Sequence, residues 1–444
     1  MKATELLSTL PSGWRTVPLK ATCYYTVSNV DKHSIEDEIP VRLCNYTDVY
    51  KNDRVSPELE LMAATATEDE IEKFHLEVGD VVITKDSESW DDIGIPAYVE
   101  ATAEDFVCGY HLAFMRPNSG LLDGRFLFRC VQSRPVALQL ELEATGVTRY
   151  GLPKGAIGNA LIPLPSLETQ RLIADYLDRE TARIDALVAE KEKMLALLEE
   201  KRAALISRAV TRGLDENAPL KLSKAPWFDK TPLSWSVEKL KWVIQSIRSG
   251  VSVNASDQPT EGDGFGVLKT SAVAGGAFIP GENKSVWDAE YDRLACPVTK
   301  NTIIMSRMNT PNLVGESGYV AEDYPNLFLP DRLWQISFDE NRVFVPFVAM
   351  LLSSKEARHA LSSMATGTSP SMKNLAIEEM SSLLVQVPPM EEQVEIYREV
   401  ARHESITNPL RNEITNSLQL LKERRAAIIT AAVTGQIPIE EMRL

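Results

Sequence analysis

The most constraining feature of this chain is an internal duplication with a very long period. The segments "EKRAALISRAVTRG" at residues 200–213 and "ERRAAIITAAVTG" at residues 423–435 align at a separation of 223 residues. A separation of 221 residues aligns 10–20 with 231–241 and places Trp14 on Trp235. Repeats of solenoid proteins are only about 20–50 residues long. The sequence therefore predicts two similar half-chains, each with its own globular part.

Each half has the same order of elements: a strand-rich stretch, a turn marked by proline, and then a long helical segment. The turns are "LIPLPS" and "LVQVPP", and proline there ends a strand and favours a helix start. We expect an α+β fold with strand-rich domains at residues 1–165 and 214–387, the second including a linker. Helical regions are expected at residues 166–213 and 388–444.

Both helical regions carry heptad patterns, which predict helices that pair along a narrow stripe. We expect an antiparallel pair of long coiled-coil helices that separates the two domains about an approximate two-fold axis. Pro409 is expected to divide the second region, with Asn408 capping the longer helix, and Gly213 and Gly435 to end the long helices. The predicted seam residues are Leu177, Ile184, Leu187, Leu198 and Leu205 in the first helix and Val400, Leu410, Ile414, Leu421 and Ile428 in the second.

Composition limits the class of protein. The net charge is −16, of which −10 falls in residues 1–165, which argues against a protein that coats phosphates nonspecifically. The five cysteines show no CxxC spacing, as is usual for reduced thiols in a cytoplasmic protein. The first residues lack a signal-peptide core, and no apolar run is long enough to span a membrane. We expect a cytoplasmic protein without a membrane partner.

The sequence contains no recognisable catalytic or metal-binding constellation. There is no HExxH motif, and the five histidines are scattered. "GAFIPGENKS" at residues 276–285 places its lysine too late for a phosphate-binding loop. "GDGFG" at residues 262–266 lacks the strand–loop–helix context of a nucleotide site. We therefore expect no catalytic residue, no metal and no cofactor in this chain.

The layout resembles the specificity subunit of Type I restriction-modification systems. The resemblance covers essentially the whole chain and rests on the duplicated "PSLETQ" and "PPMEEQ" helix starts, the "LLEEKRAALISRAVTRG" and "LLKERRAAIITAAVTG" segments, and the linker "KLSKAPWFDKTPLSW" at residues 221–235. Ser166 departs from the pattern by replacing the second proline in the first copy.

The resemblance implies a non-catalytic protein with two target-recognition domains, each reading half of a split sequence in double-stranded DNA. It implies helices that set the distance between the half-sites and dock two methyltransferase subunits, with two restriction/translocase subunits joining them. Adenosylmethionine, ATP and Mg²⁺ would then belong to the partner subunits, which direct adenine methylation or DNA cleavage.

Polar loops after the strands are the candidates for base contacts, since arginine and asparagine make the common bidentate contacts to guanine and adenine. In the first domain the candidates are Lys85, Ser87, Ser89, Trp90, Thr148, Arg149, Tyr150 and Lys154. In the second domain they are Arg307, Asn309, Thr310, Asn312, Ser369, Ser371 and Lys373.

Two other functions remain open from the residues alone. An assembly scaffold without sequence readout would bind partners but show no sequence preference. A standalone nuclease or methyltransferase with unrecognised motifs would be active in isolation.

Overall fold

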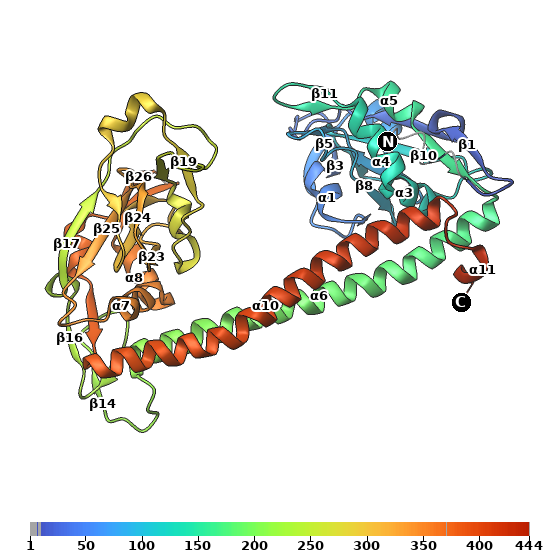
Figure 1. Ribbon diagram of the computed structural model, residues 1–444. Coiled ribbons are helices and arrows are strands. Elements are labelled where there is room, and N and C mark those ends of the chain that lie inside the picture. The colour runs from blue at the N-terminus through green and yellow to red at the C-terminus, as the bar shows by residue number, and fades with distance from the viewer. Residues whose placement is uncertain (1–6, 8–9, 370, 444) are drawn as a thin grey trace. The chain divides into compact units, whose positions relative to one another are not determined.

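The computed structural model describes residues 7, 10–369 and 371–443. The chain divides into two compact units: Met1–Glu192 with Thr415–Leu444, and Lys193–Ile414. Each unit contains one strand-rich globular part together with segments of both long helices (Figure 1). The expected mixed fold of helices and strands is confirmed.

The globular part of the first unit is built on two sheets. Its five-stranded sheet has the order β2-β10-β6-β8-β4, and a three-stranded sheet has the order β5-β3-β9. The strand bounds are β2 (Cys23–Val27), β10 (Leu112–Pro117), β6 (Val81–Thr84), β8 (Pro96–Val99), β4 (Arg54–Val55), β5 (Met62–Ala66), β3 (Ile39–Cys44) and β9 (Phe106–Cys108). The short helices are α1 (Tyr46–Lys51), α2 (Glu68–Phe74), α3 (Gly124–Gln132), α4 (Arg134–Glu143) and α5 (Lys154–Asn159).

The second unit repeats this plan with fewer strands in the main sheet. Its sheets have the orders β17-β25-β21-β23 and β19-β18-β24-β20. The strand bounds are β17 (Ile244–Ser249), β25 (Leu333–Phe338), β21 (Thr302–Ser306), β23 (Ser317–Val320), β19 (Asn283–Ser285), β18 (Gly266–Leu268), β24 (Tyr324–Phe328) and β20 (Pro297–Val298). The helices are α7 (Val345–Ser353), α8 (Lys355–Met364) and α9 (Ile377–Ser382).

The main-sheet ladders of the two units have matching registers. Thr84 pairs with Leu112 in the first unit, and Ser306 pairs with Leu333 in the second. Each unit also closes its globular part with a two-stranded ladder beside a long helix: β1 (Arg15–Pro18) with β13 (Leu161–Leu164), and β16 (Ser236–Lys239) with β28 (Leu384–Val387). The duplication seen in the sequence is thus a duplication of the fold.

The long helices α6 (Leu167–Arg212) and α10 (Met390–Val433) belong to the cores of the globular parts. In the first unit, Leu177 of α6 and Val433 of α10 join one buried apolar cluster with strands β6 and β10. In the second unit, Val210 of α6 and Val400 of α10 join the cluster around Trp235. Burial of such side chains contributes roughly 1.5–3 kcal/mol each, so each domain is fastened to both helices.

Within each unit the two helices run antiparallel. In the first unit Arg425 of α10 pairs with Asp185 of α6, and in the second unit Arg202 of α6 pairs with Glu404 of α10. In the second unit Glu199 of α6 also pairs with Arg411 of α10, and in the first unit Arg179 of α6 donates to the carbonyl of Met442, just beyond α10. Within each unit the residue numbers therefore fall along one helix where they rise along the other.

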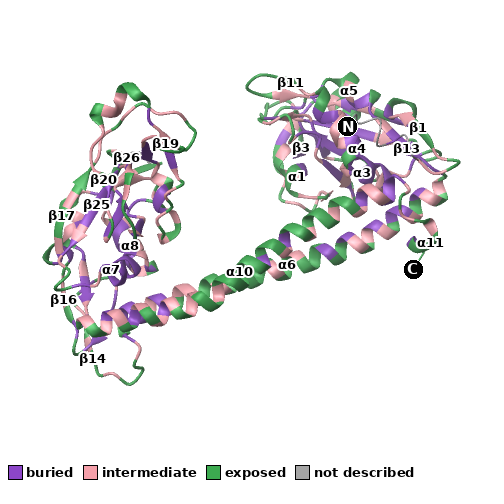
Figure 2. Ribbon diagram, in the orientation of Figure 1, coloured by how far each residue is buried: buried purple, intermediate pink, exposed green. Residues whose placement is uncertain are grey.

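The predicted seam residues lie at different depths. Leu177, Ile184, Val400 and Ile414 are buried, and Leu198, Leu205, Leu421 and Ile428 are half-buried. Leu187 and Leu410, however, are exposed at 43% and 42%. Figure 2 shows that exposed residues recur along both α6 and α10. The heptad pattern therefore overestimates burial at these two positions, because a pair of helices without a covering sheet leaves part of each side chain in solvent.

The prediction that Pro409 divides the second helical region is wrong. Helix α10 continues through this residue, so Asn408 is not a helix cap. An interior proline removes one hydrogen bond and costs about 3 kcal/mol. We attribute the tolerance of Pro409 within α10 to packing of the helix before and after it. Val400 is buried against the domain core, and Ile414 is also buried.

Both long helices end at glycine, as expected. Gly213 and Gly435 have φ of 75° and 70°, the left-handed region in which glycine avoids a Cβ clash. Gly213 donates to the Ala209 carbonyl, whereas Gly435 and Gln436 donate to Ala432 and Ala431 in a Schellman motif.

The remaining elements are short. They are the hairpin β14 (Leu220–Leu222) with β15 (Lys230–Pro232), the helix α11 (Ile439–Met442), and the 3-10 helices η1 (Leu19–Ala21), η2 (Leu240–Trp242), η3 (Thr270–Gly276) and η4 (Asp288–Arg293). None of the helices in the described residues combines the length and apolar character needed to cross a membrane.

Candidate nucleic-acid interface and helix pair

Each globular part carries a small three-stranded sheet at the end of its main sheet, hereafter the edge sheet. In the first unit it has the order β11-β12-β7, formed by Thr145–Gly146, Tyr150–Gly151 and Asp86–Ser87. In the second unit it has the order β22-β27-β26, formed by Met308–Asn309, Met372–Asn374 and Thr366–Ser369. The two candidate loops of each domain meet in this sheet.

In the first unit, the edge sheet brings together candidates separated by more than sixty residues in the sequence. Tyr150 pairs with Ser87 across the ladder. Thr148 and Arg149 are exposed in the turn before Tyr150, and Trp90 is 45% exposed beside the other strand. This group combines exposed polar side chains with an aromatic ring, which is suited to contacting bases and backbone.

Other first-domain candidates are engaged within the protein. Ser87 is buried and its hydroxyl accepts a hydrogen bond from the Ser89 amide at 3.2 Å, while the Ser89 hydroxyl donates to Asp91. Lys154 is exposed at the start of α5, and its Nζ lies 5.7 Å from the ring centre of Tyr25. Lys154 is therefore a residue of α5 and not of the edge-sheet ladder.

Lys85 lies in a charged cluster that sequence reasoning missed. Its Nζ is 2.9 Å from Oδ2 of Asp86, and the same oxygen lies 2.8 Å from Nδ1 of His111. Partial burial acts to raise the pKa of Asp86, but hydrogen bonds from His111 and Lys85 outweigh it and hold this pKa below its usual value. Nη2 of Arg149 is 3.3 Å from the same His111 nitrogen.

In the second unit, the edge sheet also gathers both candidate loops. Asn309 pairs with Lys373 across the ladder. Thr310 and Asn312 are exposed in the turn that follows, and Ser371 is exposed between β26 and β27. Ser369 lies in β26, but its side chain is outside the described part of the chain.

Arg307 lies between β21 and β22, directly before the first strand of this sheet. Its guanidinium carbon is 5.9 Å from the ring centre of Trp334. Its Nε is buried and has no hydrogen-bond partner in the described residues. Lys373, by contrast, directs Nζ toward the Ser362 carbonyl at 3.4 Å.

Two buried glutamines, also missed as functional residues, hold the long helices to the domains. The Gln170 side chain donates to the carbonyls of Leu121 and Pro165 and accepts from the Asp123 amide. Gln393 makes the same three bonds, donating to Arg342 and Pro388 and accepting from Phe344. The repeated "ETQ" and "EEQ" segments were the sequence signal for this role.

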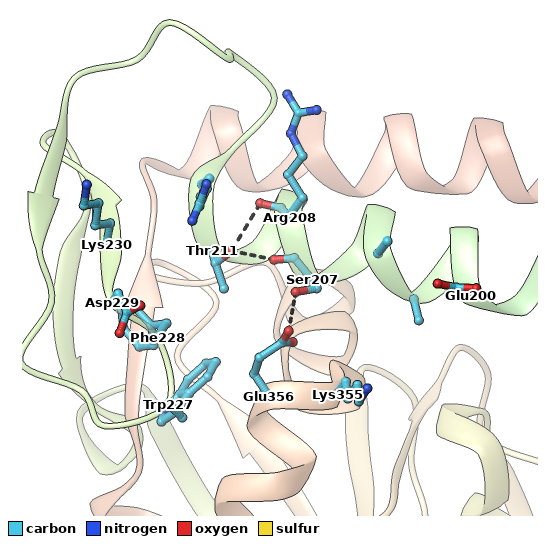
Figure 3. Close-up of a pocket in the computed structure, with 13 residues that line it drawn as sticks. Glu200, Ser207, Arg208, Thr211, Trp227, Phe228, Asp229, Lys230, Lys355 and Glu356 are labelled. Carbon is cyan, nitrogen blue, oxygen red and sulfur yellow. Dashed lines mark hydrogen bonds between the residues drawn. The ribbon is translucent and has the colours of Figure 1, made fainter.

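A groove opens along the last turns of α6 in the second unit (Figure 3). It has a volume of about 550 Å³ and is lined by α6, the start of α8 and the 227–230 segment. The Ser207 hydroxyl donates to Glu356 at 2.6 Å inside it. Trp227 and Phe228 supply its apolar part, and Arg208, Arg212, Lys230 and Lys355 supply cations.

Residues 37–196 and 232–420 both match the family described as Type I restriction modification DNA specificity domain. The chain belongs to this family. The two matched ranges correspond to the two domains with their helices, which confirms the resemblance drawn from the duplicated motifs. Among the described residues, no group of three or more histidine, cysteine, aspartate or glutamate side chains could hold a metal ion.

Relatives and a solved structure agree with this assignment. The chain is 23% identical over 364 residues to the Type I restriction enzyme EcoKI specificity subunit of Escherichia coli K12, covering 81% of this chain and 75% of that protein. It is 20% identical to the StySPI specificity subunit of Salmonella potsdam, covering 96% and 90%. A structure titled as the basis of complex assembly and conformational transition of the type I R-M system matches with a TM-score of 0.67 and 18% identity, covering 97% and 100%.

Proposed function

We propose that this chain is the non-catalytic subunit that reads a two-part DNA target, one half with each edge sheet and its flanking loops. The observation that carries the proposal is that the two domains share one fold but have different side chains on their equivalent edge sheets. Sequence is read by base-edge contacts in the grooves, and the major groove distinguishes all base pairs. A retained scaffold with a varied loop surface is the arrangement expected for two different half-sites.

The proposal assigns the chemistry to other subunits. Two methyltransferase subunits and two restriction subunits bind this chain, and they carry adenosylmethionine, ATP and Mg²⁺. The acidic balance of this chain is compatible with this arrangement, because the partners can supply most of the attraction to phosphates.

The central test is to produce the chain with the methyltransferase subunit of its own system and sequence the methylated DNA. We expect adenine methylation in a single bipartite motif with a fixed spacer. Methylation without a motif would identify an assembly scaffold. Methylation or cleavage by the isolated chain would identify a standalone enzyme.

The long helices are proposed to set the spacer. Seven residues added to a helix lengthen it by about 10 Å, equivalent to about three base pairs. We expect matched seven-residue insertions, after Glu190 in α6 and after Leu420 in α10, to change the spacer and leave both half-sites unchanged. The same insertion in the linker after Asn217 serves as control. An unchanged spacer in the variant with both helix insertions would refute the proposal that the helices set the spacer.

The groove of Figure 3 is proposed as part of the methyltransferase docking surface. Ala204 is exposed and lines it, whereas Ala196 is exposed on the same helix outside it. A carboxylate at the first position would project into the groove. We expect Ala204→Glu to reduce co-purification with the methyltransferase subunit and Ala196→Glu to leave it unchanged. Equal effects of the two changes would place docking elsewhere.

A further inference from the structure

The positions of Lys85 and Arg307 are equivalent in the two domains. The amide of Lys85 donates to the His111 carbonyl at 3.0 Å, and the amide of Arg307 donates to the Arg332 carbonyl at 3.0 Å. The carbonyls of Lys85 and Arg307 accept from Leu152 and Leu375, each at 2.8 Å. The backbone therefore presents one cation at the same place in each domain.

The residue that follows this cation differs between the domains. In the first domain it is Asp86, whose carboxylate pairs with both Lys85 and His111. The Lys85 side chain is only 13% exposed, and its Nζ also lies 4.7 Å from the ring centre of Tyr110. The hydrogen-bonding capacity of Lys85 is thus directed into the protein.

In the second domain the equivalent residue is Met308, which brings no charge. Within the described residues, the Arg307 side chain makes no hydrogen bond and no ion pair. Arg332, which replaces His111, is exposed and likewise has no carboxylate partner there. Two cations that have no counter-ion in the described part of the chain therefore flank the edge sheet of the second domain.

We propose that Arg307 reads a guanine in the second half-site, with Arg332 as an accompanying cation, and that Lys85 is a structural residue that does not contact DNA. This inference rests on the proposed function. To that function it adds the identity of one base in the target and different roles for the equivalent residues Lys85 and Arg307. It also withdraws Lys85 from the candidate base readers.

Guanine is favoured by the geometry around Arg307. Arginine binds guanine O6 and N7 through two parallel hydrogen bonds, which require a planar and oriented guanidinium. Trp334 is buried and lies beneath this group, so its orientation is restrained before binding. The buried Nε is not directed to solvent, which leaves the two terminal nitrogens to form the fork. Restraint before binding reduces the entropy lost on binding.

The experiment uses the full chain with its methyltransferase partner and duplexes carrying the methylation motif. Arg307→Ala is expected to weaken binding roughly 5- to 150-fold and to relax recognition at one G·C pair of the second half-site. Replacing that G·C pair should then leave the affinity of the Arg307→Ala variant unchanged. Arg332→Ala should weaken binding to all sequences and lower the salt dependence by about one phosphate contact. Lys85→Gln should leave binding within threefold.

A reciprocal exchange separates the role of Arg307 from a folding defect. Met308→Asp places a carboxylate beside Arg307 and should abolish recognition at the same base pair, while the first half-site is still read. Asp86→Met should leave the second half-site unchanged. Recognition of the first half-site by the Arg307 and Met308 variants reports their folding.

Several outcomes would overturn the inference. If Arg307→Ala weakens binding to all DNA sequences equally, the residue contacts phosphate and not guanine. If Met308→Asp has no effect, the missing counter-ion is not what distinguishes the domains. If Lys85→Gln relaxes the first half-site, the assigned structural role is wrong. A wild-type complex without preference at either half-site would instead refute the proposed function itself.

Discussion

Arg202 of α6 donates through Nε to Oε1 of Glu404 on α10 at a distance of 2.6 Å. Partial burial acts to lower the pKa of the Arg202 guanidinium, but Glu404 and Glu199 outweigh it and raise this pKa. The pair joins the two long helices within the second unit. It thus ties the register of α10 to that of α6 at one defined position.

We expect this pair to contribute modestly to stability. The two side chains are 31% and 28% exposed, so solvent screens their attraction. A double-mutant cycle with Arg202→Ala and Glu404→Ala should give a coupling of about 0.5–1 kcal/mol at low salt, and less in 1 M salt. Urea unfolding supplies the free energies. A coupling that does not change with salt would contradict an electrostatic origin.

Gln393 is expected to be among the residues most sensitive to truncation. Gln393→Ala removes one acceptor and two donor bonds at a fully buried site and leaves their backbone partners unpaired. Each such group costs about 1–3 kcal/mol, so we expect a loss of roughly 2–5 kcal/mol in the free energy of unfolding. Gln419→Ala, at an exposed position of the same helix, should cost less than about 0.5 kcal/mol.

Gly435 should not tolerate a side chain. A Cβ there would lie 2.4 Å from Cγ of Pro11, and φ is +70°. A left-handed residue with a Cβ costs about 1–2 kcal/mol before any clash. Gly435→Ala should therefore lower the unfolding free energy by at least about 1 kcal/mol. Gly155→Ala, where nothing lies within 4 Å, is the matched control and should be neutral or slightly stabilising.

Pro409→Ala should stabilise the chain. Alanine restores a helix hydrogen bond, and proline costs about 3 kcal/mol more than alanine inside a helix. The greater freedom of the unfolded alanine variant offsets part of this gain. We expect an increase of roughly 1–2 kcal/mol by thermal or urea unfolding. A decrease would show that a bend at Pro409 is required for packing of the helices.

The cysteines should differ in reactivity. Burial raises the pKa of the Cys23 thiol to about 12, and it also raises the pKa values of Cys44, Cys108 and Cys130. A raised pKa leaves little of the reactive thiolate at pH 8. Cys296 is only half-buried, with a smaller increase of its pKa from burial. With a thiol reagent at pH 8, we expect Cys296 to react first in the folded protein and all five to react after unfolding. Rapid reaction of Cys44 would indicate local opening of the first domain.

The two edge sheets show why the sequence could propose candidate residues but could not show which of their side chains are available to DNA. Polar loops after strands placed both Lys85 and Arg307 among the candidates, with Arg307 and Asn309 first because of their residue types. Whether each is available depends on Asp86 and His111 in one domain and on Met308 and Arg332 in the other. His111 and Arg332 come from another strand region, so loop composition does not reveal which cation is neutralised.

Local patterns in the sequence were sufficient for the duplication, the long helices, their glycine ends and the family. Each of these follows from residue periodicity or from backbone preferences that act over a few positions. The continuity of α10 through Pro409, the exposure of Leu187 and Leu410, and the neutralisation of Lys85 depended on tertiary structure. Packing between distant segments can offset an unfavourable local preference, and the charge state of a side chain's surroundings is set by neighbours that lie far away along the chain.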